Sequence, residues 1–73
     1  MSMPEMHPVS STSIALVGYD EESQEAYVEF HKGGLYVYRG VPPQEFENLW
    51  KAQSVGQYHH AYFVNVYPYE RIG

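Results

Sequence analysis

Two strand-like segments joined by a pair of glycines dominate the middle of the sequence. In the first segment, Gln24–Phe30, apolar and polar residues alternate, so an extended chain has one apolar side and one polar side. The second segment, Leu35–Tyr38, is apolar on both sides. Between the two segments, Gly33 and Gly34 supply the positive φ angles that a tight turn requires. The pattern predicts an antiparallel hairpin, so the fold must contain a sheet.

A further strand is predicted ahead of this hairpin. Ile14–Tyr19 is a short apolar run of strand length, and the polar residues Asp20–Ser23 that follow it favour a turn. Because the connections are short, neighbouring strands run antiparallel. The first 40 residues therefore predict a three-stranded antiparallel β-meander.

The sheet is followed by a predicted helix. The prolines at 42–43 end the sheet and set the φ angle for a helix start. Phe46, Leu49 and Trp50 then occupy positions i, i+3 and i+4, which form one apolar stripe on a helix that runs to about Ala52. We expect this stripe to lie across the sheet, with Trp50 mostly buried.

A second short helix and an extended tail complete the predicted fold. Ser54 and Gln57 have the spacing of a capping box, which indicates a helix start. The tail, residues 66–72, is expected to be extended because proline at 68 disfavours helix at the residue before it. The predicted class is α+β: a three-stranded antiparallel β-meander followed by two short helices packed on one face, with an extended C-terminal tail.

Chain length and cysteine content limit the domain organisation. Seventy-three residues without cysteine form one domain, which must be held together by packing alone. We assign residues 9–73 to this domain and residues 1–8 to a mobile N-terminal leader without periodicity. The longest apolar stretch, Ile14–Gly18, is far shorter than the roughly 20 residues of a membrane span, and no basic region begins an export signal. We therefore expect a cytoplasmic protein.

Short motifs follow one another along the chain in a recognisable order. They are Ser10-Ser11-x-Ser13-Ile14, Gly18-Tyr19-Asp20, Val28-x-Phe30, Gly33-Gly34, Tyr36-x-Tyr38, Val41-Pro42, Ser54-x-Gly56-x-Tyr58 and Tyr67-Pro68-Tyr69-Glu70-Arg71. This order resembles the KTSC domain family, which is named after the C-terminal segment of some lysyl-tRNA synthetases and also occurs as stand-alone bacterial or phage proteins. The resemblance runs from about Pro8 to Ile72. It implies RNA binding, the function suggested for the family from its attachment to a tRNA synthetase.

The sequence departs from the family pattern in its charge. Family members carry basic residues around the Gly-x-Tyr segment and between it and the tail, whereas this chain has Val55, Gln57, His60 and Val64 there. The net charge is −5, from four Lys or Arg and nine Asp or Glu residues. Both features weaken the attraction to phosphate backbones.

The eight tyrosines allow two interpretations. Tyr27, Tyr36 and Tyr38 could stack nucleobases on a sheet face. Tyrosine is also a good strand former that fills a core and leaves its hydroxyl at the rim. For Tyr36 and Tyr38, which lie opposite the apolar side of the preceding strand, the sequence favours core packing. Tyr27 is flanked by Glu25 and Glu29, whose charges disfavour a nucleic-acid face.

No metal or cofactor site is predicted. His59 and His60 are adjacent, so on a helix they point about 100° apart and do not bind one ion together. We expect both to be partly exposed histidines that titrate near pH 6.5.

The sequence also predicts no catalytic residues. Ser10, Ser11 and Ser13 precede a strand, outside any nucleophile elbow. The carboxylates of residues 20–22 lie in an exposed turn, where their pKa values are not tuned for acid–base work. A chain this short also has little room for an enclosed active site. We therefore expect a non-enzymatic protein.

The tail Tyr67-Pro68-Tyr69-Glu70-Arg71 is the most informative segment for function. It either closes the fold, with a tyrosine packed on the helices, or presents an aromatic pair and an arginine to a partner. The sequence favours the structural role for Tyr67 or Tyr69 and an exposed contact for Arg71.

Taken together, these features predict a small binding module. One hypothesis is weak binding of RNA or single-stranded nucleic acid, and the alternative is protein–protein interaction through an aromatic patch. The candidate binding residues are Arg39, Lys51, Tyr67, Tyr69 and Arg71.

Overall fold

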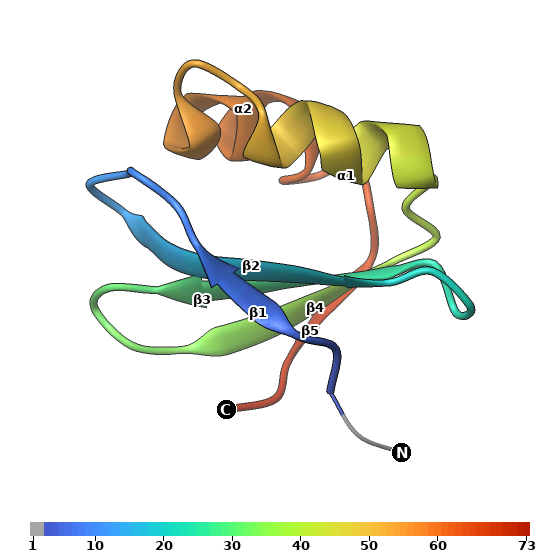
Figure 1. The fold of residues 1–73 in the computed structure, drawn as a ribbon. Coiled ribbons are helices and arrows are strands. Elements are labelled where there is room, and N and C mark those ends of the chain that lie inside the picture. Colours follow the sequence, from blue (N-terminus) through green and yellow to red (C-terminus); the bar gives the residue numbers. More distant parts are fainter. Residues whose placement is uncertain (1–2) are drawn as a thin grey trace.

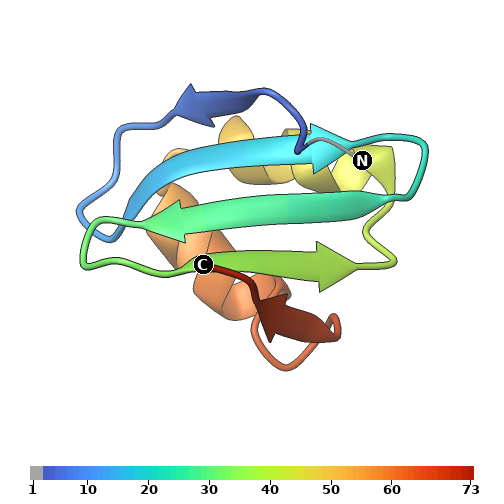
Figure 2. The same ribbon diagram turned by 90° about the horizontal axis from the view of Figure 1, so that it is seen from below.

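The computed structural model describes residues 3–73 as a two-layer α+β fold. Two helices lie on one face of a five-stranded antiparallel sheet, whose strands follow one another in sequence order (Figure 1). Figure 2 shows the opposite face of this sheet, where no helix of the described residues lies. The strands are β1 (Met6–Pro8), β2 (Ile14–Asp20), β3 (Glu25–Phe30), β4 (Leu35–Arg39) and β5 (Tyr69–Arg71).

The three central strands confirm the predicted meander. Val28 of β3 is paired with Val17 of β2 and with Tyr36 of β4. Gly33 and Gly34, at φ angles of 106° and 101°, form the turn between β3 and β4. The alternation in β3 therefore correctly predicted which side of this strand is buried, and the glycine turn correctly predicted that β3 pairs with β4.

The prediction of three strands is wrong, because a short strand is added at each edge of the sheet. β1 lies within residues 1–8, the segment predicted as a mobile leader, and pairs with β2. Residues 1 and 2 of that segment lie outside the described residues. At the other edge, β5 is the predicted extended tail and pairs with β4. A three-residue strand is too short to show periodicity, so neither pairing was visible in the sequence.

The close approach of β1 to β2 depends on one glycine. A Cβ atom on Gly18 would lie 2.8 Å from the carbonyl oxygen of Glu5 and would also overlap the Met6 sulfur. A side chain at this position would therefore push the first strand away from the sheet.

Both helices form where their start signals predict. α1 (Pro43–Trp50) begins with proline at its first turn, and α2 (Val55–Tyr62) is capped by the Ser54 hydroxyl, which accepts a hydrogen bond of 3.3 Å from the Gln57 amide. No helix of residues 3–73 is long and apolar enough to cross a membrane.

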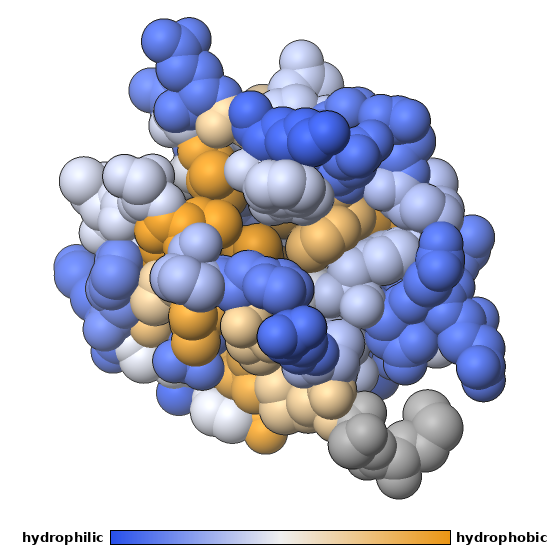
Figure 3. Space-filling model, in the orientation of Figure 1, coloured by the Kyte–Doolittle hydropathy of each residue, from blue (hydrophilic) through white to orange (hydrophobic). Residues whose placement is uncertain are grey.

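The core lies between the helices and the sheet. Its fully buried members come from all three central strands, both helices and their connections: Ile14, Val17, Ala26, Val28, Tyr38, Val41, Leu49, Val55 and Phe63. In the space-filling view, apolar side chains gather between the two layers, whereas hydrophilic side chains cover the helices and the end of the molecule at the β2–β3 turn (Figure 3).

The expected burial of Trp50 is wrong. Leu49 is fully buried towards the sheet, whereas Trp50 is 47% exposed. Neighbouring residues on a helix point about 100° apart, so the residue that follows Leu49 faces sideways at the end of α1. Lys51 lies over the Trp50 ring, with its Nζ 5.5 Å from the ring centroid.

Candidate functional site

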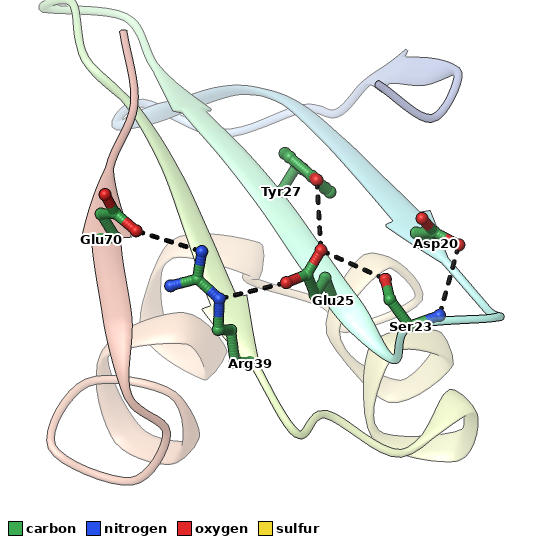
Figure 4. Close-up of polar contacts among 6 residues, drawn as sticks. All are labelled: Asp20, Ser23, Glu25, Tyr27, Arg39 and Glu70. Atoms are coloured by element: carbon green, nitrogen blue, oxygen red, sulfur yellow. Dashed lines mark hydrogen bonds and ion pairs between the residues drawn. The ribbon is translucent and has the colours of Figure 1, made fainter. Parts of the chain in front are cut away.

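Arg39, the first candidate binding residue, is held by two carboxylates. Its guanidinium lies 3.1 Å from Glu25 on the neighbouring strand β3 and 3.1 Å from Glu70 on β5 (Figure 4). The hydrogen bonds that the guanidinium donates to Glu70 and to Glu25 raise the pKa of Arg39 above its ordinary value. The charge of Arg39 is therefore already balanced within the sheet.

Lys51, the second candidate, is also paired. Its ammonium lies 3.1 Å from Glu47, one helical turn earlier. Neither Arg39 nor Lys51 is thus a free cation for a ligand phosphate.

The tail divides into a structural part and an exposed part. Tyr67 is half-buried, and its ring packs edge-on against Phe63 at a centroid distance of 5.2 Å. Tyr69 is 59% exposed, while its ring lies 5.9 Å from that of Tyr36 and 5.6 Å from that of Tyr38. Tyr67 therefore has the structural role that the sequence favoured for one of these two tyrosines, and the Tyr69 ring is largely open to solvent.

Tyr69 and Arg71 point to the helix side of the sheet edge. On β5 they are paired with Tyr38 and Tyr36, whose strand turns these two tyrosines towards the helices. Of the five candidate residues, the structure brings together only these two.

Tyr69 forms one wall of a groove that we call the aromatic groove. The groove has a volume of about 670 Å³ and is open on one side. It is lined by Thr12, Ser13, Phe30, Lys32, Gly33, Tyr36, Tyr38, His59, Val64, Asn65 and Tyr69. In the described part of the chain, Lys32 is the only charged residue of this lining, so no carboxylate faces the groove.

A buried hydrogen bond forms the floor of the aromatic groove. The His59 Nε2 and the Tyr38 hydroxyl are 2.8 Å apart. Burial, with a smaller contribution from His60, lowers the pKa of His59 to about 4, and burial raises the pKa of Tyr38 to about 12. Both groups are therefore neutral at pH 7.

The position of His59 corrects the expectation of two exposed histidines. His59 is only 6% exposed, whereas His60 is exposed. The His59 ring also packs against Phe30 and Phe63, so α2 uses this histidine as a core residue with one polar contact.

A second groove adjoins the first, and we call it the hydroxyl groove. It has a volume of about 770 Å³ and is lined by Ser10, Ser11, Thr12, Ser13, Gln53, Ser54, Gly56, Gln57 and His60. Thr12 and Ser13 line both grooves, so the two adjoin at the loop before β2. No carboxylate in the described part of the chain lines either one.

Two cations at this end of the molecule are unpaired. Lys32 and Arg71 form no salt bridge with a carboxylate of residues 3–73. The Arg71 Nε donates instead to the carbonyl oxygen of Gly73, at 2.9 Å. A Cβ on Gly34, in the same turn as Lys32, would lie 3.7 Å from the Arg71 guanidinium. The β3–β4 turn therefore brings both cations close to Tyr69.

Lys32 and Tyr36 are not among the five binding residues predicted from the sequence, which favoured core packing for Tyr36. Lys32 belongs to a glycine turn, and its surroundings depend on the pairing of β5 with β4, which joins segments more than 30 residues apart. Glu29 lies only three residues before Lys32, so the sequence gives no sign that Lys32 forms no salt bridge within residues 3–73.

The described residues contain no evident metal site. Among residues 3–73, no group of three or more His, Asp or Glu side chains is arranged to hold a metal ion.

Comparison with known proteins gives a consistent family match. The family model for the KTSC domain matches residues 10–67. A protein of Tsukamurella paurometabola is 40% identical over 53 residues, which cover 73% of this chain and 79% of that protein. A protein of Stutzerimonas stutzeri is 40% identical over 55 residues, covering 75% and 78%. A lysine–tRNA ligase of Nostoc punctiforme is 29% identical over 72 residues, which are 99% of this chain and only 13% of the ligase.

A solved structure supports the same assignment. The crystal structure of a KTSC domain protein from Yersinia pestis matches with a TM-score of 0.93 and 30% identity, covering 97% of this chain and 100% of that chain. The resemblance seen in the sequence motifs is thus confirmed, although only a small part of the ligase is shared. The chain belongs to the KTSC domain family.

Proposed function

We propose that this protein is a non-enzymatic binding module that holds an unpaired base of a single-stranded nucleic acid in the aromatic groove. The observation that carries the proposal is the composition of the groove. In a chain of net charge −5, it combines exposed tyrosine with Lys32, has no carboxylate in its described lining, and lies close to Arg71. Bases stack on aromatic rings, and the adjoining phosphates pair with cations.

The rings define where a base would stack. Tyr69 is exposed on one side, and its other side is supported by Tyr36 and Tyr38. A supported ring loses little conformational freedom when a base stacks on it, which favours binding. Stacking on one such ring contributes about 1–3 kcal/mol.

The charge of the molecule limits the expected affinity. Lys32 and Arg71 could neutralise two phosphates, so the logarithm of the binding constant should fall with that of the salt concentration at a slope of about −1.4. We therefore expect weak binding with a shallow salt dependence. The lysine–tRNA ligase relative supports RNA as one ligand class, since part of that ligase resembles this chain.

The proposal is tested by titrating labelled single-stranded oligonucleotides with the wild type and two tyrosine variants. Tyr69→Ala should weaken binding about tenfold, because it removes the stacking ring, and should leave the urea melt within about 0.5 kcal/mol of the wild type. Tyr62→Ala is the matched control, since Tyr62 is 53% exposed on α2 but lies outside the aromatic groove. Equal affinities for the two variants would contradict the proposal.

A protein partner is the second candidate, favoured by the exposure of Trp50. Trp50 lines a mainly apolar cavity of about 290 Å³ together with His7, Pro8, Val9, Val17 and Phe46. Exposed tryptophan beside an apolar pocket is typical of interface hot spots. If the protein interaction is the function, Trp50→Ala abolishes capture of a partner from the host lysate after nuclease treatment, while oligonucleotide binding is absent in the wild type.

A further inference from the structure

The hydroxyl groove is lined mainly by hydroxyl and amide groups. Hydroxyls of Ser10, Thr12 and Ser13 line it from the loop before β2, and the amides of Gln53 and Gln57 line it from α2 and the segment before it. Within the described residues, His60 is the one titratable side chain of this lining, which contains no Lys, Arg, Asp or Glu and no large apolar side chain. A lining in which hydroxyls and amides outnumber one imidazole suits a polyol better than a phosphate, which prefers several cations, or an apolar ligand, which would leave the hydroxyls and amides unpaired.

Several of these polar groups are free to bind a ligand. Three hydroxyls have structural partners: the Ser11 Oγ accepts hydrogen bonds from the Ser13 and Ile14 amides and is hydrogen-bonded to the Ser13 Oγ at 3.4 Å, and the Ser54 Oγ caps α2. The side chains of Ser10, Thr12, Gln53 and Gln57 make no hydrogen bond within residues 3–73. A ligand with several hydroxyl groups could therefore replace the water on these side chains with donors and acceptors of its own.

The wall between the loop and α2 is closely packed at one point. A Cβ on Gly56 would lie 2.8 Å from the Ser13 Oγ and 3.3 Å from the Ser11 Oγ. The serine loop is therefore held against the helix at a glycine, and the groove has a fixed floor.

The two grooves adjoin at Thr12 and Ser13, as a base and the sugar next to it adjoin in a nucleotide chain. We propose that the hydroxyl groove is a ribose subsite, which binds the 2′-hydroxyl of the nucleotide adjoining the stacked base and so selects RNA over DNA. The inference rests on the proposed function of the aromatic groove. Ribose is a neutral polyol, which matches the hydroxyl and amide groups of this groove. Its 2′-hydroxyl is the group by which proteins distinguish RNA from DNA.

The test compares a short oligouridylate with the deoxyuridine oligomer of the same length, so that the bases are identical. The wild type should bind the ribose form about three- to tenfold more tightly, the ratio that one net hydrogen bond contributes. In the double variant Ser10→Ala, Gln57→Ala, the affinity for the ribose form should fall to that for the deoxyribose form, which should itself be unchanged because neither residue lines the aromatic groove. Both residues are exposed, and their side chains make no hydrogen bond within residues 3–73, so the fold is retained.

The control is Ser23→Ala, which removes a hydroxyl from the β2–β3 turn outside both grooves. It should keep the preference for the ribose form. Equal binding of the two oligomers by the wild type would overturn the ribose subsite and leave the aromatic groove intact, as would a preference that persists in the double variant. Absence of binding to either oligomer would overturn the proposed function, and the ribose subsite with it.

Discussion

The two ends of the sheet differ in how they use charge. At the β2–β3 turn, the Asp20 carboxylate accepts a hydrogen bond from the Ser23 amide, and Glu25 contacts Ser23, Tyr27 and Arg39 (Figure 4). At the opposite end, the β3–β4 turn and the loop before β2 border two grooves that no carboxylate of the described residues lines. At the first end, Arg39 is paired with Glu25 and Glu70, whereas the second leaves Lys32 and Arg71 without a salt bridge in residues 3–73.

This difference shows that net charge is a poor guide to a small protein's ligand. A value of −5 describes the whole chain, yet the acidic residues of the β2–β3 turn lie at one end. Screening limits the reach of their field to roughly 8–10 Å at physiological ionic strength. A ligand at the grooves therefore meets mainly the local charges.

The largest expected effect is a loss of stability. It tests whether the end of the sheet that carries the two grooves depends on the hydrophobic core below it. Phe63 is fully buried and contacts the rings of Tyr38, His59 and Tyr67 below the aromatic groove. Phe63→Ala should cost about 3–5 kcal/mol, enough to unfold a domain of this size in a thermal melt.

Trp50→Ala is the contrasting variant, because this ring is half exposed. It should lower the free energy of unfolding by about 1 kcal/mol or less. A loss as large as that of Phe63→Ala would show that the side of α1 facing β1 carries as much of the core as the groove end does.

The next effect is the pH dependence contributed by His59. Its pKa is lowered from 6.5 to about 4 by burial, so between these values the unfolded chain takes up a proton that the folded chain does not. The contribution of His59 is complete above pH 6.5 and is lost as the pH falls towards 4. We expect a loss of about 2 kcal/mol between pH 7 and pH 5, less than the full linkage value because this interval covers only part of the range between the two pKa values.

Urea melts at pH 7 and pH 5 measure this loss in two variants. His59→Gln keeps a polar partner for Tyr38 and should flatten the pH dependence. His60→Gln, a change at the exposed neighbour, should keep it. If both variants retain the wild-type profile, the acid sensitivity arises from the carboxylates rather than from the groove floor.

A smaller effect distinguishes the free lysine from the paired one. Lys32→Ala should reduce the steepness of the salt dependence of oligonucleotide binding by about 0.7, because one phosphate contact is lost. Lys51→Ala, which removes a cation already paired with Glu47, should leave it unchanged. An equal change of the slope in both variants would mean that the two lysines attract the oligonucleotide at long range. The proposed difference between the two ends of the sheet would then not affect ligand binding.

The smallest effect is expected at Arg39. Its ion pairs with Glu25 and Glu70 are exposed to solvent, and such pairs are weak and screened by salt. Arg39→Ala should therefore lower the melting temperature slightly at low salt, and not at high salt, without weakening oligonucleotide binding. A clear loss of oligonucleotide binding in this variant would indicate that the binding site lies near Arg39, at the β2–β3 end of the sheet, and not at the grooves.

The sequence allowed most of the central fold to be predicted, because its signals are local. The alternation in β3, the glycine turn after it, and the Ser54 cap of α2 each act within a few residues. The edge strands β1 and β5 were missed because three residues carry no period, and their partners lie elsewhere in the chain.

The candidate site was predicted only in part, for the same reason. Tyr69 and Arg71 were selected from the tail itself, whereas the pairing of Arg39 with Glu25 and Glu70 depends on strand register. The burial of His59 depends on which face of α2 meets the sheet. Two adjacent histidines look alike in a sequence and differ once the helix is packed.

The short edge strands also bear on how the protein behaves at high concentration. An open strand edge presents unpaired amide and carbonyl groups that can recruit a strand from another molecule. Here β1 covers the long apolar strand β2, and Pro8 at its end lacks an amide to offer an incoming chain. Removal of residues 1–8 would uncover the edge of β2 at Leu16, Val17 and Gly18, and we expect such a shortened chain to self-associate into sheet-rich aggregates.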